Sequence, residues 1–315
     1  MEESAINSTD TILKGTLWSK TKRQTEIARN CGALKSIETE YHLIKDNIPF
    51  VVRTLSNLTR KQQARQQQSQ QEQKTGKRVD PFLPYEPDLF VGDISSTHIC
   101  LLNKFNVVDN HLLIVTRAFE SQTDLLNLQD FAALWLCLQE IDGLAFFNGG
   151  KIAGASQPHK HLQLIPLPFL PDEVHLPLDR AIANTAFQDF GKIDCFDFRH
   201  GIAKLDLPLD TLTQQAAQTM LELYRVLLAK VGFQLDANQS KQPGAYNFLA
   251  TRNWMAIVPR SQESWQNISI NSLGFAGSLF VRDRHQLELL KKLTPLKLLA
   301  EVAIDSRQST VNSQQ

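Results

Sequence analysis

Hydrophobic and polar residues alternate along the chain with two different periods. Apolar residues recur at close to 3.6 positions in residues 124–145, 210–232 and 285–304, which predicts a helix in each range. We expect Asp210 to cap the second of these helices and Gly232 to end it. The first 30 residues, in which apolar pairs are separated by polar residues, suit one amphipathic helix.

Shorter apolar runs predict strands. One begins after Asn47, and residues 96–105 and 111–117 form two more runs joined by a turn-like segment, which is typical of a hairpin. Residues 246–250 and 255–259 predict a second hairpin, and residues 159–166 form a further strand.

The composition changes abruptly after the first predicted strand. Residues 62–73 contain eight glutamines in twelve positions and no large apolar side chain. Such a segment buries too little surface to offset the entropy lost on ordering, so we predict a mobile loop at 57–80, inserted in the domain. A solvated helix is the alternative for the glutamine run.

Length, charge and cysteine content narrow the class of protein. The 315 residues, 42% hydrophobic and 21% charged, are typical of a globular protein with about two domains or one large domain. The 33 basic residues balance the 33 acidic ones, which argues against a broad nucleic-acid surface but allows a small phosphate site. Four scattered cysteines exclude a zinc ribbon or thioredoxin motif. An acidic start and short apolar runs predict a cytoplasmic protein without a membrane partner.

A weak internal repeat connects the two predicted hairpins. Residues 110–117 match residues 253–260 in pattern, and Asn148 and Asn271 are each followed at the same distance by Ala-Gly. Two interpretations stay open: unrelated hairpins that share common strand residues, or a duplicated unit whose second copy has lost its chemistry.

The strongest chemical signal lies in residues 148–166. On a strand, His159, His161 and Gln163 point to the same face at intervals of about 7 Å, two strand rises. Just upstream, residues 154–157 (Gly-Ala-Ser-Gln) offer backbone N–H groups and a hydroxyl that can bind a phosphate. With Asn148, these groups form a candidate site for phosphate chemistry.

Histidine suits the transfer of a phosphoryl or nucleotidyl group. Neutral imidazole attacks phosphorus readily and leaves it readily, and its ordinary pKa near 6.5 keeps most of it neutral in the cell. Donors must then neutralise the phosphate oxygens in the transition state. Two other interpretations remain open: His-x-His as part of a metal site, although no third ligand has a telling spacing, and two structural histidines on a solvated strand.

These residues carry a resemblance to a known family. The sequence His-Lys-His-Leu-Gln at 159–163 resembles the His-x-His-x-Gln signature of the transferase branch of the histidine-triad superfamily. Residues 101–108, 111–117, 119–122, 154–161 and 268–277 resemble diadenosine tetraphosphate phosphorylases, also called ATP adenylyltransferases. The resemblance covers residues 45–300 or thereabouts.

The resemblance implies roles for individual residues. His161 would be the nucleophile that accepts AMP, and Asn148 would bind a phosphate or ribose oxygen. Arg53 and Arg282 stand where lysine is usual in the family, which keeps the charge but changes the hydrogen-bond geometry. The substrate-binding positions implied by the resemblance are Arg53, Gly92, Asp93, Asn148, Gly154, Ala155, Ser156, Gln157, His159, Gln163, Asn271, Ser272, Leu273 and Arg282.

The resemblance also implies a fold and a reaction. We expect an α+β protein with an antiparallel, histidine-triad-like sheet, a catalytic region at 1–200, an ATP adenylyltransferase-type region at 201–305 and a frayed tail at 306–315. The implied reaction is phosphorolysis of diadenosine tetraphosphate to ADP and ATP, with nucleotides and phosphate as partners. No tightly bound cofactor and no protein metal site are expected, although Mg²⁺ can accompany the substrate.

Alternatives of other classes stay open at this point. They are a sugar-phosphate nucleotidyltransferase of the galactose-1-phosphate uridylyl type, a hydrolase of the same superfamily, and a sensor that binds dinucleoside polyphosphates without turnover. The uridylyl type usually has proline between the two histidines, where this chain has Lys160.

Overall fold

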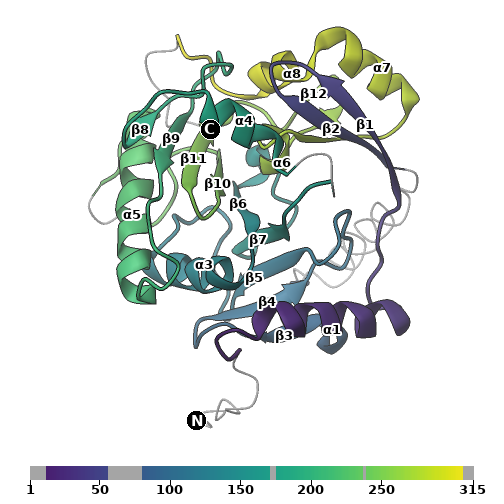
Figure 1. The fold of residues 1–315 in the computed structure, drawn as a ribbon, viewed down its shortest axis with the longest axis vertical. Helices are drawn as coiled ribbons and strands as arrows, with labels where there is room; N and C mark the ends of the chain where they lie inside the picture. Colours follow the sequence, from purple (N-terminus) through teal and green to yellow (C-terminus); the bar gives the residue numbers. More distant parts are fainter. Residues whose placement is uncertain (1–11, 56–79, 171–174, 237–238, 308–315) are drawn as a thin grey trace, which may run out of the picture.

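A nine-stranded, fully antiparallel sheet forms the centre of the molecule (Figure 1). The computed structural model describes residues 12–55, 80–170, 175–236 and 239–307. In spatial order, the strands are β3 (Phe90–Asp93), β4 (His98–Leu102), β5 (Leu112–Thr116), β7 (His161–Pro166), β6 (Gly143–Gly149), β10 (Tyr246–Ala250), β11 (Trp254–Pro259), β9 (Gly201–Lys204) and β8 (Phe190–Gly191). The expected α+β fold on an antiparallel sheet is therefore confirmed.

Two helical layers cover the sheet. One face packs against α1 (Leu17–Asn30), α3 (Leu128–Glu140) and α5 (Thr213–Lys230). The other face packs, over β7, β6, β10, β11 and β9, against α4 (Pro177–Ala183), α6 (Ser272–Phe275), α7 (Arg284–Leu293) and α8 (Pro295–Val302). A small sheet of β1 (Thr39–Lys45), β2 (Pro49–Leu55) and β14 (Ser278–Val281) lies beside α7 and α8 (Figure 1). The remaining short elements are η1 (Pro87–Leu89), η2 (Lys151–Ala153), β12 (Ser264–Trp265) and β13 (Ile268–Ser269).

Both predicted hairpins and the predicted strand after Asn47 are confirmed. β4 pairs with β5, and β10 pairs with β11, in unbroken antiparallel registers. The helix predicted at 124–145 is shorter than expected, because α3 ends at Glu140 and β6 starts at Gly143. A Cβ on Gly143 would come within 2.7 Å of the Ile165 carbonyl oxygen, so this residue suits close strand pairing better than a helix.

Two other helix predictions need correction. The helix predicted at 285–304 is divided into α7 and α8 at Thr294, because Pro295 cannot continue a preceding helix and occupies the first turn of the next. Asp210 is not a cap, since α5 begins at Thr213 after Leu212. Gly232, with a φ of +90°, follows the end of α5 as expected.

Other expectations fall partly outside the described residues. Of the first 30 residues, α1 accounts for the predicted helix, and residues 1–11 lie outside. The predicted glutamine-rich loop lies outside except for Asp80, as do residues 308–315 of the predicted tail.

The two halves of the chain share their sheets. β6 pairs with β10 across the expected division near residue 200, and β2 pairs with β14. The proposed repeat is matched only in part: both hairpins exist, but Asn148 lies in a strand whereas Asn271 caps α6.

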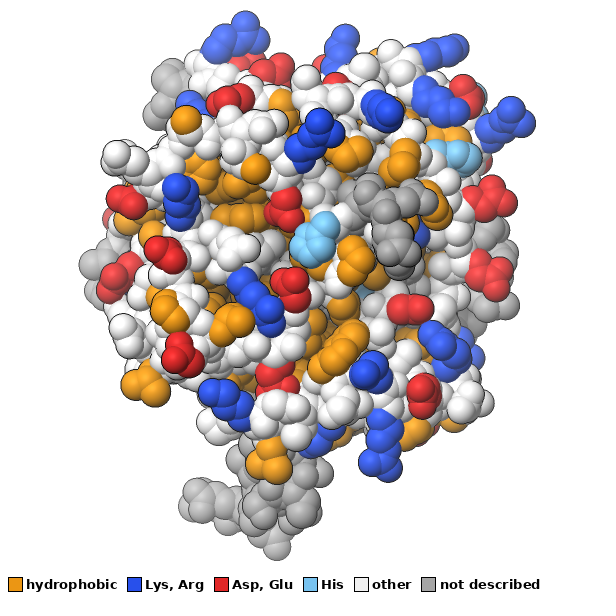
Figure 2. Space-filling model, in the orientation of Figure 1, with side chains coloured by type: hydrophobic (Ala, Val, Ile, Leu, Met, Phe, Trp, Pro, Cys, Tyr) orange, Lys and Arg blue, Asp and Glu red, His pale blue; other side chains and the backbone are white. Residues whose placement is uncertain are grey.

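The surface agrees with the balanced charge of the sequence. Basic and acidic side chains are interspersed over the face in Figure 2. Among the described residues, no helix combines the length and apolar character needed to cross a membrane.

Candidate active site

The segment 158–166, which we call the histidine strand, ends in β7, and β7 lies in the middle of the sheet between β5 and β6. Leu162 and Leu164 belong to the core under α3, whereas His161 and Gln163 face the opposite side, as the strand pattern predicts. His159 lies just before β7 and forms an isolated bridge with Ser121.

His161 has one ring nitrogen fixed by the main chain. Its Nδ1 lies 2.8 Å from the carbonyl oxygen of His159, and its side chain packs against Phe82. A carbonyl oxygen only accepts hydrogen bonds, so Nδ1 carries the proton and the lone pair of the neutral ring is on Nε2. Burial lowers the pKa of His161 to about 4. The imidazole is therefore neutral and nucleophilic near pH 7.

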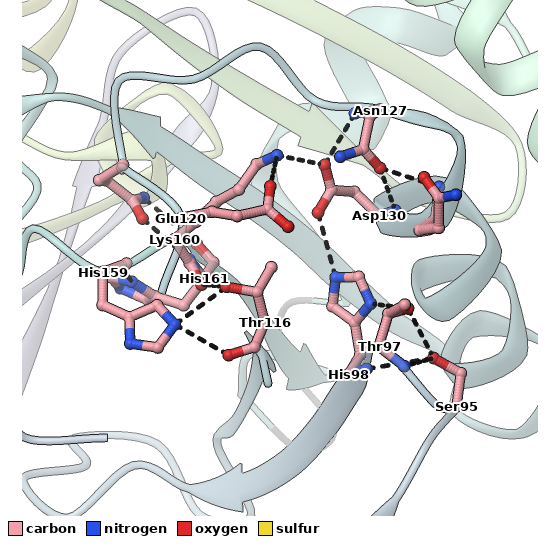
Figure 3. A network of polar contacts seen from close by, with 12 residues as sticks. Ser95, Thr97, His98, Thr116, Glu120, Asn127, Asp130, His159, Lys160 and His161 are labelled. Carbon is pink, nitrogen blue, oxygen red and sulfur yellow. Dashed lines mark hydrogen bonds and ion pairs between the residues drawn. The ribbon is translucent and has the colours of Figure 1, made fainter. Parts of the chain in front are cut away.

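His159 is held on both sides by protein groups. Its Nδ1 lies 2.8 Å from a carboxylate oxygen of Asp80, and its Nε2 lies 2.8 Å from the carbonyl oxygen of Thr116. The ring is fully buried and lies toward Thr116, away from Lys160 (Figure 3). Both ring nitrogens are occupied, so His159 contributes to the site through its carbonyl oxygen, which orients His161.

The glycine loop lies against the start of α6. Gly154 has a φ of +90°, and a Cβ there would come within 2.9 Å of Asn271. The N–H groups of Gly154 and Ala155 donate to Lys151 and Gly150 within the loop. The main-chain N–H groups and side chains of Ser156 and Gln157 form no hydrogen bond with the described residues, so they are the donors available to a ligand.

Asn148 joins the sheet to α6. Its Oδ1 accepts hydrogen bonds from the Ser272 N–H at 2.9 Å, the Ser272 hydroxyl at 2.8 Å and the Asn247 amide at 2.9 Å. Asn271 caps α6 by accepting from the N–H of Leu273, whose side chain is buried in the core. The structure therefore brings Asn148, Gly154 and the residues of α6 together around one point.

Gln163 lies next to His161 on the same face and is bound by another histidine. Its Oε1 lies 2.9 Å from Nε2 of His111.

Among the described residues, no group of three or more His, Cys, Asp or Glu side chains could hold a metal ion.

The other predicted contacts lie farther from His161. Asp93 is on the edge strand β3, in a cross-strand row that runs through Ile99 and Val115 to His161. Three strand spacings separate its backbone from His161, roughly 14 Å. Asp93 pairs with Arg117, and Gly92 lies at a bulge beside it.

Of the two predicted arginines, Arg53 lies on the small sheet and Arg282 lies just after it. Arg53 on β2 donates to the carbonyl oxygen of Phe169 at 3.3 Å, and its Nε has no hydrogen-bond partner among the described residues. Burial lowers the pKa of Arg53. Arg282 follows β14 and is exposed.

Sequence reasoning did not identify three residues around the site. Gln122 is buried and accepts a hydrogen bond from the main chain of His161, and Asn247 is buried and donates to Asn148. Asp80 is bound to His159. A buried polar residue within the otherwise apolar strand 246–250 was a signal for Asn247. Asp80 ends the glutamine-rich segment, where no pattern indicates a contact.

The fold and the site define a class of protein before any comparison. An antiparallel α+β sheet that carries a neutral, buried imidazole, with a glycine-containing donor loop just upstream in the chain, is typical of enzymes that transfer nucleotidyl or phosphoryl groups. Family models agree with this class: the Ap4A phosphorylase N-terminal domain matches residues 7–184, and the ATP adenylyltransferase C-terminal domain matches residues 194–305. The chain belongs to the Ap4A phosphorylase family.

Known relatives agree with this assignment. Diadenosine 5',5'''-P1,P4-tetraphosphate phosphorylase 2 of Saccharomyces cerevisiae is 32% identical over 240 residues, covering 68% of this chain and 72% of the relative. The crystal structure of yeast Ap4A phosphorylase Apa2 with AMP has a TM-score of 0.73 at 25% identity, covering 95% of this chain and 100% of that chain. The same protein with Ap4A has a TM-score of 0.74 at 24% identity, covering 93% and 99%.

Proposed function

We propose that this chain is a nucleotidyltransferase that cleaves diadenosine tetraphosphate (Ap4A) with inorganic phosphate, giving ADP and ATP in a reversible reaction. The adenylyl group is held covalently on His161 between the two steps. The observation that carries the proposal is the state of His161, whose Nδ1 is bound to the His159 carbonyl oxygen at 2.8 Å while burial keeps the ring neutral. Membership of the Ap4A phosphorylase family supports the choice of substrate.

The first step forms a bond between Nε2 of His161 and the α-phosphorus of Ap4A. The bond from that phosphorus to its bridging oxygen breaks, and ATP leaves. The proton on Nδ1 stays on the ring, where the His159 carbonyl oxygen stabilises the positive charge that develops. In the second step, an oxygen of inorganic phosphate attacks the same phosphorus, the bond to Nε2 breaks, and ADP leaves.

The phosphate oxygens need donors in both transition states. We assign this role to the free N–H groups of Ser156 and Gln157 and to their side chains. Gly154 allows the loop to lie against Asn271 at the start of α6, whose next residue, Ser272, is bonded to Asn148. Gln163, beside His161, completes the phosphate contacts.

The outer parts of the substrate are assigned to more distant residues. Gly92 and Asp93 on the edge strand β3, in the row that leads to His161, are assigned to a nucleoside. Arg53, whose Nε is unpaired within the part of the chain that the structure describes, is assigned to the distal phosphates, as is the exposed Arg282. Any Mg²⁺ would arrive with the phosphate chain.

The four free cysteines are consistent with action in the reducing cytoplasm.

The first experiment is cleavage of Ap4A with and without inorganic phosphate. We expect ADP and ATP to form only when phosphate is present. The variant His161→Ala is expected to lose turnover while it still binds Ap4A, because binding depends mainly on the loop and the arginines. The matched control is His175→Ala, which removes an exposed histidine that is paired with Asp142 and Asp179.

Each product pattern has a separate meaning. Release of AMP and ATP without phosphate would show a hydrolase and would overturn the proposal. Near-normal turnover by His161→Ala would overturn the assignment of the nucleophile. Absence of an adenylylated protein after incubation with Ap4A in the absence of phosphate, measured by intact mass, would exclude the covalent step.

A further inference from the structure

The ladder between β6 and β7 stops just before His161. The two strands pair from Gly143 opposite Pro166 to Phe146 opposite Gln163. If this register continued, Asn148 would lie opposite His161 and exchange main-chain hydrogen bonds with it. The observed ladder lacks this last pair, so β6 and β7 separate at His161, the residue that carries the reactive imidazole.

The side-chain amide of Gln122 occupies this opening. Its Oε1 accepts from the N–H of His161 at 2.8 Å, and its Nε2 lies 3.0 Å from the carbonyl oxygen of Asn148 and 3.2 Å from that of His161. The side chain is almost fully buried. One amide group thus supplies the donor and acceptor that a neighbouring strand residue would otherwise provide.

The segment that carries Gln122 is itself fixed to the histidine strand. The main-chain N–H of Gln122 donates to the carbonyl oxygen of Pro158 at 2.7 Å, and the N–H of Lys160 donates to the carbonyl oxygen of Glu120 at 2.8 Å. On the opposite face, the Lys160 ammonium reaches Glu120 and Asp130 (Figure 3). Gln122 is therefore held in place from two directions, and its amide is preorganised.

We infer that Gln122 is a positioning residue for the nucleophile. It holds the main chains of His161 and Asn148 apart where the sheet opens, so that the phosphate chain can lie across the side chains of both residues. Without the amide, the buried N–H of His161 and the carbonyl oxygen of Asn148 would need water or would draw the strands together. Either change moves Nε2 relative to the donors at Ser156 and Gln157. This inference rests on the proposed function.

The test compares Gln122→Met with Gln139→Ala. Methionine keeps the length of the side chain and removes all three hydrogen bonds. Gln139 is a matched control, because its amide also donates to two main-chain carbonyl oxygens, those of Leu209 and Thr211, far along the chain from His161. We expect Gln122→Met to lower kcat about 100-fold with KM changed less than about threefold. Gln139→Ala is expected to keep kcat within about twofold of the wild type.

Single-turnover formation of the adenylylated protein from Ap4A is measured alongside, and it should slow as much as kcat. If kcat of Gln122→Met stays within about twofold of the wild type, the inference is overturned. A raised KM with unchanged kcat would also overturn it, because the residue would then act in substrate binding.

Two further measurements decide the matter if Gln122→Met does not fold. The variant Gln122→Glu keeps the acceptor for the His161 N–H but loses the amide donors, so the same fall in kcat is expected and an unchanged kcat would contradict the inference. In the wild type, NMR should show slow hydrogen exchange of the His161 amide, since Gln122 is its acceptor. Fast exchange would overturn the inference even if the protein had no Ap4A phosphorylase activity, so the two failures are distinguishable.

Discussion

A single buried imidazole sets the pH range in which the proposed reaction can begin. Desolvation lowers the pKa of His161 to about 4, although the hydrogen bond to the His159 carbonyl oxygen and the nearby Asp80 oppose this shift. A base with a lowered pKa is neutral above that pKa and is lost as a nucleophile below it. His161 therefore stays reactive through the range in which an ordinary histidine becomes charged.

The pH dependence of kcat/KM for Ap4A tests this state of the free enzyme. We expect no loss of kcat/KM from His161 between about pH 7 and pH 5, and a fall as the pH approaches about 4. Circular dichroism at each pH separates loss of activity from unfolding. A fall centred near the ordinary histidine pKa of about 6.5 would show that the ring is not desolvated in solution.

At the scale of residues, the sequence predicts which nearby side chains share a face of a strand, because their spacing determines it. Alternation along a strand places His161 and Gln163 on one face, and the structure agrees. Gln122 lies 39 positions from His161, and Asn247 lies 99 positions from Asn148. Nothing in local spacing encodes such pairs, because strand order and the end of a ladder decide them.

At the scale of elements, a buried ion pair joins the histidine strand to α3. The Lys160 ammonium lies 2.6 Å from Asp130, which also binds His98 and closes the capping box at the start of α3 (Figure 3). Burial alone would lower the pKa of Lys160, but Asp130 and Glu120 together raise it. Burial alone would likewise raise the pKa of Asp130, but His98 and Lys160 hold it below its usual value. Both groups are therefore charged in the folded protein.

Removing one partner of this pair should destabilise the fold. Lys160→Met leaves the Asp130 carboxylate buried without its ammonium, and we expect a loss of about 3–5 kcal/mol in the free energy of unfolding. The control Lys291→Met breaks an exposed pair with Glu288, which solvent screens, and should change the free energy of unfolding far less. Urea denaturation measures both. Equal losses in the two variants would mean that the buried pair adds nothing beyond an exposed one.

Helix ends show how far periodicity predicts an element. The apolar period of 285–304 continues through Thr294 and Pro295, but a residue before proline avoids the helical region, and Thr294 has a φ of +68°. The break was therefore encoded in the sequence. The end of α3 at Glu140 was less visible, because the following apolar residues fit a helix or a buried strand equally well.

At the scale of the whole molecule, the sheets cross the boundary between the two family domains. β6 and β10 exchange main-chain hydrogen bonds, β2 pairs with β14, and Asn148 is satisfied by Asn247 and Ser272 from the C-terminal region. The indole N–H of Trp135 on α3 also donates to the carbonyl oxygen of Thr211. Either region alone would expose a long apolar strand edge and leave buried polar groups without partners. The two regions are thus expected to fold as one unit.

Tryptophan fluorescence can test this cooperativity directly. Trp135 is buried in the N-terminal region and Trp254 in the C-terminal region, so each reports on one family domain. Two variants each retain one of these tryptophans and carry phenylalanine at the other tryptophan positions. For each variant, we expect the urea midpoint measured by fluorescence to equal the midpoint measured by circular dichroism. Far-ultraviolet circular dichroism follows the whole sheet. Because both signals are compared within the same variant, a change in stability caused by the substitutions shifts both midpoints equally. If the Trp135 signal changed at a different urea concentration from the circular dichroism of the same variant, the regions would unfold separately. The shared sheet would then be too weak to couple Asn148 to α6, and the site would open before the fold is lost.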